Sequence, residues 1–437
     1  MVSNTGTWMQ RVAQDWLVLQ LPGNSGTELG ITTGLQFLPI LLLTPYAGVV
    51  ADRFPKRRLM QLTQAMMALA SLALGLVAVL GVAQTWHVYV IAFLFGVGSA
   101  FDAPARQSFV SEMVGRDDLT NAVGLNSASF NAARILGPGL AGLMIGALGG
   151  GAEATGWVIL VNAVSYLAVI WQLQRMNTAL LQSPTTQPRR PGMLLEGVKY
   201  VRSQPLMILI LIVVFFAGTF GMNFQITSAL MATEVFGKGA GEFGLLGSVM
   251  AVGSLTAALL NARRVRIRVR LVVVAAVGFG LAEIVAGVLP SYLTFALFAP
   301  VIGFTALTML NSANATMQTE SDPLMRGRVM AFYFTIVMGG TPLGAPVIGW
   351  VGQHLGARWT LVLGGLLTIA GVAIALAVYA RLKGGTSVVL TEVGAPSRLV
   401  SRVWDNQAVA RARIQAGGQA PTSGADSPLG ETLSGSR

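Results

Sequence analysis

The sequence contains no cysteine and only two histidines, His87 and His354. Without cysteine, the chain has neither a disulfide framework nor a thiolate metal site, and both histidines fall in predicted turns. No Gly-x-x-x-x-Gly-Lys-Ser/Thr loop occurs, which disfavours an ATP-driven pump. We therefore expect no metal centre, no cofactor and no enzymatic activity.

Charged residues are also scarce, at 11% of the chain against 53% hydrophobic residues. This composition excludes an ordinary soluble domain and indicates an all-α membrane protein that crosses the bilayer many times. Apolar stretches of about 20 residues, the length with which a helix crosses the hydrocarbon core, recur along the sequence. We count twelve, at 2–21, 31–51, 59–82, 88–109, 121–148, 156–173, 205–230, 241–260, 271–289, 292–317, 328–352 and 359–380.

The longest break between these stretches divides them six and six. It carries Pro184, Pro188 and Pro191, followed by an amphipathic segment over 194–202. After Lys383 the hydrophobicity stops, and the tail is rich in small residues and proline. We expect an N-terminal half over 1–173, a cytoplasmic central loop over 174–204, a C-terminal half over 205–383 and a cytoplasmic, largely disordered tail over 384–437.

Cations gather on one side of the predicted bundle. The loop over 52–58 holds four of them, and each would cost roughly 2.5 to 3.5 kcal/mol inside hydrocarbon. If this loop is cytoplasmic, only Lys238 and Arg358 fall in connections on the opposite side. We therefore expect both termini in the cytoplasm and the lipid bilayer as a partner. The net charge of +11 reflects this orientation and does not indicate a nucleic-acid partner.

The first apolar stretch lacks the marks of a cleavable signal peptide. It contains Arg11 and Asp15, and neither a basic leader nor a small-residue cleavage site accompanies it. We expect this segment to remain in the mature protein as its first membrane helix.

An internal repeat supports the division into two halves. Gly137-Pro138-Gly139-Leu140-Ala141-Gly142 in the first half has a counterpart in Gly344-Ala345-Pro346-Val347-Ile348-Gly349 in the second. Both segments place glycine and proline inside a predicted helix after a basic turn. Parallel halves of this kind suit a transporter that binds substrate between them near the membrane midplane.

The loop from Gly48 to Arg57 resembles the loop 2-3 motif of major facilitator superfamily transporters. In that motif Gly48 permits close helix packing, Asp52 is the charged switch, and Arg53 and Arg57 are its cationic partners. Pro55 occupies the position of the usual second glycine, so the loop departs from the family in its turn conformation. The resemblance implies the superfamily's fold of twelve membrane helices and a gate at this cytoplasmic loop.

The segment with Gly137, Pro138, Gly139 and Gly142 resembles the fifth-helix motif that marks proton antiporters of this superfamily. Pro138 removes a backbone donor while the glycines admit a neighbouring helix, so the segment is expected to act as a hinge in a packed interface. The alternative is generic packing of small residues. The arginine often found on the fourth helix of these antiporters would fall near Ala92 and is absent.

Two further segments, 6–16 and 104–112, resemble the bacterial branch of enterobactin exporters, drug exporters and secretion-effector transporters. This match favours export and places the protein in a bacterial cytoplasmic membrane. Many members begin with an extra basic stretch, whereas this chain opens almost directly at its apolar part, which is compatible with a truncated start.

Four polar or aromatic residues of the first stretch, Asn4, Trp8, Arg11 and Asp15, follow one helical stripe. We expect this stripe to face the central cavity. Arg11 and Asp15 can pair across one turn, and a change in protonation of Asp15 would release or recapture Arg11. A permanent structural ion pair is the alternative.

Two other buried charges are expected. Arg134 lies one turn before Gly137, with Asn131 on nearly the same face, and it needs a partner such as Asp15, Glu283 or an anionic substrate. Structural pairing is the alternative. Glu283 falls mid-membrane on a helix that in this superfamily usually belongs to the outer, supporting ring.

Two polar groups of the sequence remain. Asp102 and Arg106 are expected to join Asp52 and Arg53 in a cytoplasmic gate, or else to form a solvated surface pair. Seven amides are candidates for binding a polar substrate, or for joining helices at about 1 kcal/mol each. They are Gln36, Asn131, Asn223, Gln225, Asn311, Asn314 and Gln318.

These features predict a monomeric secondary transporter that exports small organic molecules, drug-like compounds or siderophores, by alternating access in exchange for protons. A nutrient or lysolipid transporter of the same fold is one alternative, because a fold does not fix direction. A membrane assembly or sensor protein without transport is another, and it would have a collapsed apolar centre without buried charges. The substrate itself is left open: a basic pair suits anions, and an apolar lining suits lipophilic drugs.

Overall fold

The computed structural model describes residues 1–21, 25–115, 118–177, 181, 193–264 and 269–383. These belong to one compact unit, Met1–Ala395, and the second unit, Pro396–Arg437, lies outside the described part, as does the expected tail. Every regular element of the described residues is helical.

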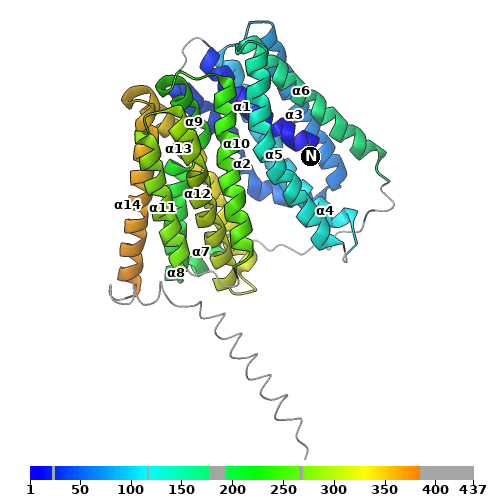
Figure 1. The fold of residues 1–437 in the computed structure, drawn as a ribbon. Helices are drawn as coiled ribbons and strands as arrows, with labels where there is room; N and C mark the ends of the chain where they lie inside the picture. The colour runs from blue at the N-terminus through cyan, green and yellow to red at the C-terminus, as the bar shows by residue number, and fades with distance from the viewer. Residues whose placement is uncertain (22–24, 116–117, 178–180, 182–192, 265–268, 384–437) are drawn as a thin grey trace, which may run out of the picture. The chain divides into compact units, whose positions relative to one another are not determined.

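The N-terminal half consists of six helices in chain order, drawn from blue to green in Figure 1. Ser25 caps the second of them by accepting a hydrogen bond from the Glu28 amide at 3.1 Å. The helices are α1 (Val2–Gln20), α2 (Gly26–Arg53), α3 (Lys56–Val79), α4 (Thr85–Met113), α5 (Leu119–Ala147) and α6 (Ala152–Arg175).

The C-terminal half follows a short helix, α7 (Met193–Arg202). Its first span is interrupted, whereas the other five are continuous. The interrupted span consists of α8 (Pro205–Phe216), η2 (Ala217–Gly221), α9 (Phe224–Leu230) and η3 (Met231–Val235), and the others are α10 (Ala240–Ala262), α11 (Val269–Val288), α12 (Tyr292–Glu320), α13 (Arg326–Leu355) and α14 (Ala357–Lys383).

The interruption corrects the expectation of a continuous helix over 205–230. Two π-helical turns, η2 and η3, flank α9, and the chain unwinds at Met222 and Asn223. The Asn223 side chain donates a hydrogen bond to the Thr219 carbonyl at 2.8 Å, which satisfies one backbone acceptor beside the break. Breaks of this kind commonly accompany functional sites in membrane helices.

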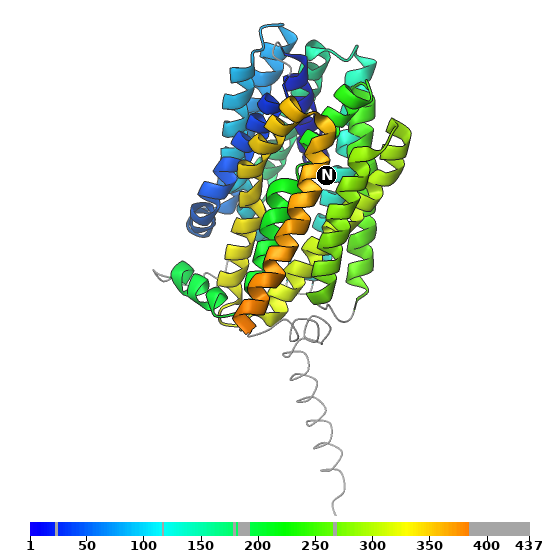
Figure 2. The same ribbon diagram turned by 90° about the vertical axis from the view of Figure 1, so that its left-hand side faces the viewer.

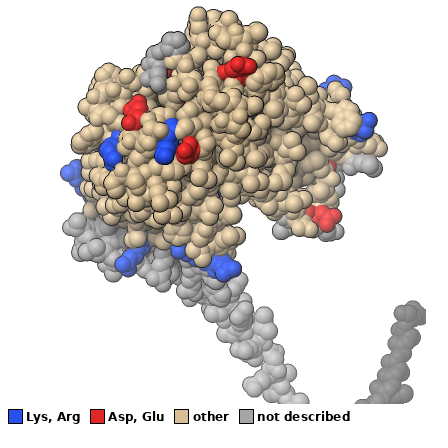
Figure 3. Space-filling model, turned by 45° about the horizontal axis from the view of Figure 1, so that its top comes forward, with Lys and Arg blue, Asp and Glu red and all other residues tan. Residues whose placement is uncertain are grey.

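Ten helices of the described residues are long and apolar enough to cross a membrane. Helices α1 and α5, with 19 and 29 residues, complete two sets of six but carry Arg11, Asp15 and Arg134. The surface in Figure 3 shows few charged side chains, as expected for a bundle surrounded by lipid.

The two halves meet closely at one end of the bundle, which we call the closed end and define by Gly26 of α2 and Leu355 of α13. Two pairs of helices cross between the halves there, α2 with α13 and α5 with α10. A Cβ atom on Gly30 or Gly349 would clash with backbone across the first seam, and one on Gly142 or Gly244 would clash across the second. The repeat found in the sequence therefore forms two equivalent backbone seams.

At the opposite end, which we call the open end, the halves diverge (Figure 1). It is defined by the last turn of α4 and the first turn of α13, and Figure 3 shows the surface hollowed between the halves. Because α2, α4, α6, α10, α12 and α14 end here, most described cations of the connecting segments lie at this end.

Helix α7 lies at the open end and is inclined to the long helices (Figure 2). Glu196 forms an ion pair with Arg328 of α13, and the Tyr200 hydroxyl accepts a hydrogen bond from the Asp322 amide at 3.1 Å. These contacts tie the amphipathic segment to the beginning of α13, so the connection between the halves is anchored to the C-terminal half.

Candidate functional site

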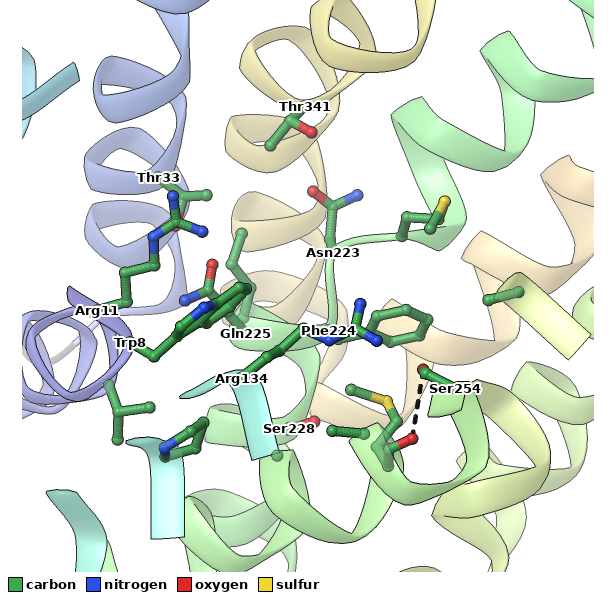
Figure 4. Close-up of a pocket in the computed structure, with 18 of the residues that line it drawn as sticks. Trp8, Arg11, Thr33, Arg134, Asn223, Phe224, Gln225, Ser228, Ser254 and Thr341 are labelled. Carbon is green, nitrogen blue, oxygen red and sulfur yellow. Dashed lines mark hydrogen bonds between the residues drawn. The ribbon is translucent and has the colours of Figure 1, made fainter. Parts of the chain in front are cut away.

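A cavity of about 290 Å³ lies between the two halves (Figure 4). Its size approaches that of ordinary small-molecule sites, which begin near 300 Å³. Helices α1, α2 and α5 supply one wall, and the interrupted span with α10, α12 and α13 supplies the other. Among the candidates from the sequence, it brings together Trp8, Arg11, Arg134, Pro138, Asn223 and Gln225.

Arg11 enters the cavity among aromatic rings. Its guanidinium carbon lies 4.8 Å from the centre of the Trp8 ring and 5.6 Å from that of Phe37. Such contacts hold a cation over the negative face of a ring. Trp8 in turn packs edge-on against Phe130 of α5 with ring centres 6.0 Å apart, so the aromatic support of Arg11 is itself fixed.

Arg134 reaches the same cavity from α5 (Figure 4). One terminal nitrogen donates a hydrogen bond to Asn131 at 3.2 Å, and the buried Nε has no partner among the described residues. Gly137 packs α5 against α1, since a Cβ atom there would meet the Trp8 Cβ at 2.5 Å. The close approach of the two helices is what places both cations on one wall.

Asp15 departs from the expected stripe. Only 2% of it is exposed, its Oδ2 has no hydrogen-bond partner among the described residues, and it does not line the cavity. The described ion pairs within 4.0 Å do not include one between Arg11 and Asp15. Asn4, the first member of the stripe, accepts a hydrogen bond from Arg106 at 2.6 Å instead of facing the cavity.

The wall from the C-terminal half is neutral. The unwound residues Met222 and Asn223 lie in it, with Phe224, Gln225 and Ser228 following. Two amides of this segment were predicted from the sequence, but its aromatic and hydroxyl members were not, because an unbroken helix was expected here. Six further lining residues had no signal in the sequence: Thr33, Phe37, Phe243, Met250, Ser254 and Thr341.

Several predicted cavity amides lie outside the cavity lining. Gln36 is 5% exposed and accepts a hydrogen bond from Gln14 at 3.4 Å, so it joins α2 to α1. Asn314 accepts a hydrogen bond from Gln318 on α12, and neither Asn314 nor Asn311 lines the cavity. Asn131 also lies off the lining and contacts Arg134. Helical spacing shows which residues share a face of a helix, but it does not show which neighbouring helix packs against that face.

Glu283 is buried inside the C-terminal half, away from the cavity lining. It is 1% exposed, and both carboxylate oxygens lack a hydrogen-bond partner among the described residues. A Cβ atom on Gly221 would meet its Oε2 at 2.8 Å and the Thr368 hydroxyl at 2.9 Å. The carboxylate therefore lies directly behind the break in the seventh span.

The predicted gate residues are only partly brought together. Asp102 is buried and pairs with Arg106 at 3.5 Å, while Thr63 and Gln64 donate hydrogen bonds to it. Arg57 instead binds the last carbonyls of α6, and Arg53 is exposed. Gly48 lies within α2, and the side chain of Asp52 lies outside the described part of the structure.

The proline motif of α5 meets a serine that the sequence analysis did not identify. The Ser248 hydroxyl of α10 accepts a hydrogen bond from the Gly139 amide at 3.0 Å and donates one to the Ile135 carbonyl at 2.5 Å. These are the two backbone groups that would bond to each other in an unbroken helix. Across the other seam, Gln353 accepts a hydrogen bond from the Gly26 amide at 2.9 Å.

Known proteins resemble the chain along most of its length. A family described as transmembrane secretion effectors matches residues 1–407. The multidrug efflux pump Tap of Mycolicibacterium fortuitum is 28% identical over 369 residues, covering 82% of this chain and 89% of that protein. The staphyloferrin A transporter of Staphylococcus aureus is 32% identical over 141 residues, covering 32% of this chain and 35% of that protein.

Solved structures of transporters share the fold. A bacterial homologue of the lysosomal transporter Spinster superposes with a TM-score of 0.66 at 15% identity, covering 87% of this chain and 95% of that one. A D-xylose-proton symporter superposes with a TM-score of 0.65 at 14% identity, covering 88% and 98%. The predicted all-helical fold is confirmed, and the chain belongs to the transmembrane secretion effector family of major facilitator transporters.

Proposed function

We propose that this transporter exports small organic molecules by alternating access, in exchange for protons. The observation that carries the proposal is the cavity between the halves, which contains two cations and is sealed at one end by two backbone seams. An assembly or sensor protein without transport would have no use for charges at this depth. The likeness to the multidrug efflux pump Tap and to the staphyloferrin A transporter supports a small-molecule substrate.

The open end faces the cytoplasm in this proposal. Its connecting segments hold most of the described cations, whereas Lys238 and Arg358 lie at the closed end. Cytoplasmic loops carry the excess of lysine and arginine in membrane proteins. Both termini are then cytoplasmic, and the cavity is ready to receive a molecule from inside the cell.

Proton coupling is assigned to the buried charges. Asp15 lies one helical turn from Arg11, so its protonation would change the field at a cavity cation. Glu283, behind the break of the seventh span, is the second candidate. During transport, the backbone seams at the closed end would separate while the gate around Asp52, Asp102 and Arg106 closes. One monomer would carry out the whole cycle.

Inside-out membrane vesicles test this function. Fluorescent drug-like compounds and iron chelators are added outside, and a proton gradient, acidic inside, is imposed. The proposal predicts accumulation that collapses when a protonophore is added and is missing from vesicles without the protein. Accumulation only in right-side-out vesicles would indicate uptake, and no movement of any compound in either orientation would contradict transport.

A further inference from the structure

We propose that the cavity selects organic anions, molecules that carry a carboxylate or similar acidic group on an apolar body. This inference rests on the proposed transport function and specifies the class of substrate. It assigns the recognition of charge to Arg11 and Arg134 and the recognition of the apolar body to the surrounding aromatic side chains.

The lining carries charge of one sign. Arg11 and Arg134 both face the cavity, and no aspartate or glutamate lies among its described lining residues. The two buried carboxylates at membrane depth, Asp15 and Glu283, lie behind the walls. A lipophilic cation in this cavity would be repelled by both guanidinium groups and would find no counter-charge on the surface it touches.

Both guanidinium groups have N–H donors that bind no acceptor among the described residues. The Nε atoms of Arg11 and Arg134 are buried without a hydrogen-bond partner, and among the described residues the one acceptor for either side chain is Asn131. A planar fork of donors matches a carboxylate. Because an uncompensated buried cation is costly, an anion that enters gains the interaction that the protein itself leaves unmade.

The remaining lining suits an apolar body attached to the acid. Trp8 and Phe37 flank Arg11, while Phe224, Phe243 and Met250 lie on the wall of the C-terminal half. A flat ring can pack against these side chains while its acidic group turns toward the N-terminal wall. The N-terminal half thus supplies the charge with two aromatic rings beside it, and the C-terminal half completes the apolar surface, so a substrate that satisfies both must contact both halves.

The sign of the substrate's charge also determines how the membrane potential affects its transport. A cytoplasm that is electrically negative favours the exit of an anion and the entry of a proton. Exchange of the two would therefore draw on the membrane potential through both partners. A cationic drug leaving the cell would have to move against the same potential.

Three dansyl compounds that differ in one group test the proposal. Dansylglycine carries a carboxylate, dansylglycinamide a neutral amide and dansyl ethylenediamine an ammonium group. Binding to the full-length protein in detergent is measured by dansyl fluorescence, and transport is measured in inside-out vesicles. We expect dansylglycine to bind about tenfold or more tightly than the amine, as charge-assisted hydrogen bonds to two arginines imply.

Arginine variants identify the source of the preference. Arg11→Met and Arg134→Met should each weaken dansylglycine binding about tenfold and leave amide binding within about twofold. Arg11→Lys and Arg134→Lys, which keep the charge but not the fork, should fall between. Arg263→Gln removes an exposed arginine at the end of α10 and serves as the matched control. Amide binding verifies that each variant is folded.

Tighter binding of the amine or the amide than of dansylglycine would overturn the proposal. So would a dansylglycine preference that survives both Arg→Met changes together. Transport of the amine in vesicles without a carboxylate preference would leave the exporter function standing and reject the anion specificity. A preserved carboxylate preference in binding, with no transport of any compound, would instead reject the exporter function and uphold the specificity.

Discussion

The two halves repeat one helical plan but contribute different chemistry to the cavity. The N-terminal half supplies both cavity cations, Arg11 and Arg134, with Asp15 one turn away. The C-terminal half supplies neutral and aromatic side chains from an interrupted span, and its buried carboxylate, Glu283, lies behind that break. In the proposed mechanism, the first half therefore recognises charge and carries the proton, while the second half shapes the cavity.

The largest expected effect comes from exchanging the carboxyl group of Asp15 for an amide, with the same exchange at Glu283 as the comparison. Asp15→Asn should abolish accumulation driven by a proton gradient while substrate still equilibrates down its own gradient, because a fixed amide cannot take up a proton. Glu283→Gln should keep gradient-driven transport within about twofold, since Glu283 lies behind the break of the C-terminal half, whereas Asp15 lies one helical turn from a cavity cation. Vesicle accumulation with and without an imposed gradient measures both.

The opposite outcome for these two variants would contradict the assignment of the proton to the N-terminal half. If Glu283→Gln uncoupled transport and Asp15→Asn did not, the proton would be carried by the C-terminal half. Membrane levels of both variants must match the parent, and passive equilibration of substrate serves as the internal control for folding.

The seams test whether the two halves close in equivalent ways. Gly142→Ala on α5 and Gly349→Ala on α13 each place a Cβ atom against backbone of the opposite half. Overpacking costs about 1 to 3 kcal/mol, so the closed end should open about tenfold more often. Gly124→Ala on α5 is the matched control, because a Cβ atom there meets nothing within 4 Å.

Cysteine labelling reports the opening directly. The chain contains no cysteine, so Thr33→Cys introduces a single thiol in the cavity wall. We expect the two seam variants to speed its reaction with a membrane-impermeant maleimide applied at the closed end. Unchanged rates in both would contradict the assignment of these seams as the seal.

The corresponding loops of the two halves at the open end differ in one acidic residue. Asp52 is the acid of the predicted gate motif near the end of α2, whereas Asn261 stands roughly at the corresponding place before the arginines of the second half. We expect Asp52→Asn to slow the transport cycle several-fold with substrate affinity nearly unchanged. Initial transport rates and binding constants separate the two quantities. A large loss of affinity with a normal rate of exchange would contradict the role of Asp52 in the gate.

The smallest expected effect belongs to the serine that bridges α10 and α5. Ser248→Ala removes the hydroxyl bound to Gly139 and Ile135, and one such hydrogen bond contributes about 1 kcal/mol. The labelling rate of Thr33→Cys from the closed end should rise about fivefold. Thr256→Ala, which removes an exposed hydroxyl on the same helix, should leave that rate unchanged.

Sequence periodicity and charge were sufficient to predict the long helices and to identify the two cavity cations. Apolar length located every long helix of the described residues to within a few residues, because hydrocarbon imposes that length on any span. Arg11 and Arg134 were identifiable because cations at membrane depth are rarely retained without a role. Gly142 and Gly349 were identifiable as close contacts from their place in the repeat.

The cross-helix relationships were not predictable in the same way. Nothing in the sequence specified that Ser248 would meet the proline motif, that Gln36 would bind Gln14, or that Asn4 would bind Arg106. The break at Asn223 had a local signal in the neighbouring glycines, yet the strong hydropathy of 205–235 favoured a continuous helix. The local sequence pattern determines where a helix forms. The residues that it contacts on other helices depend on how the whole bundle packs.

Proton movement measured during transport shows directly whether substrate is exchanged for protons through Asp15. Inside-out vesicles that hold the pH-sensitive dye pyranine are given a transported substrate with no initial pH gradient and with the membrane potential clamped by potassium and valinomycin. We expect the lumen to become more alkaline as substrate enters, and Asp15→Asn vesicles to take up substrate without this change. Substrate entry in parent vesicles with an unchanged or more acidic lumen would contradict proton exchange through the N-terminal half.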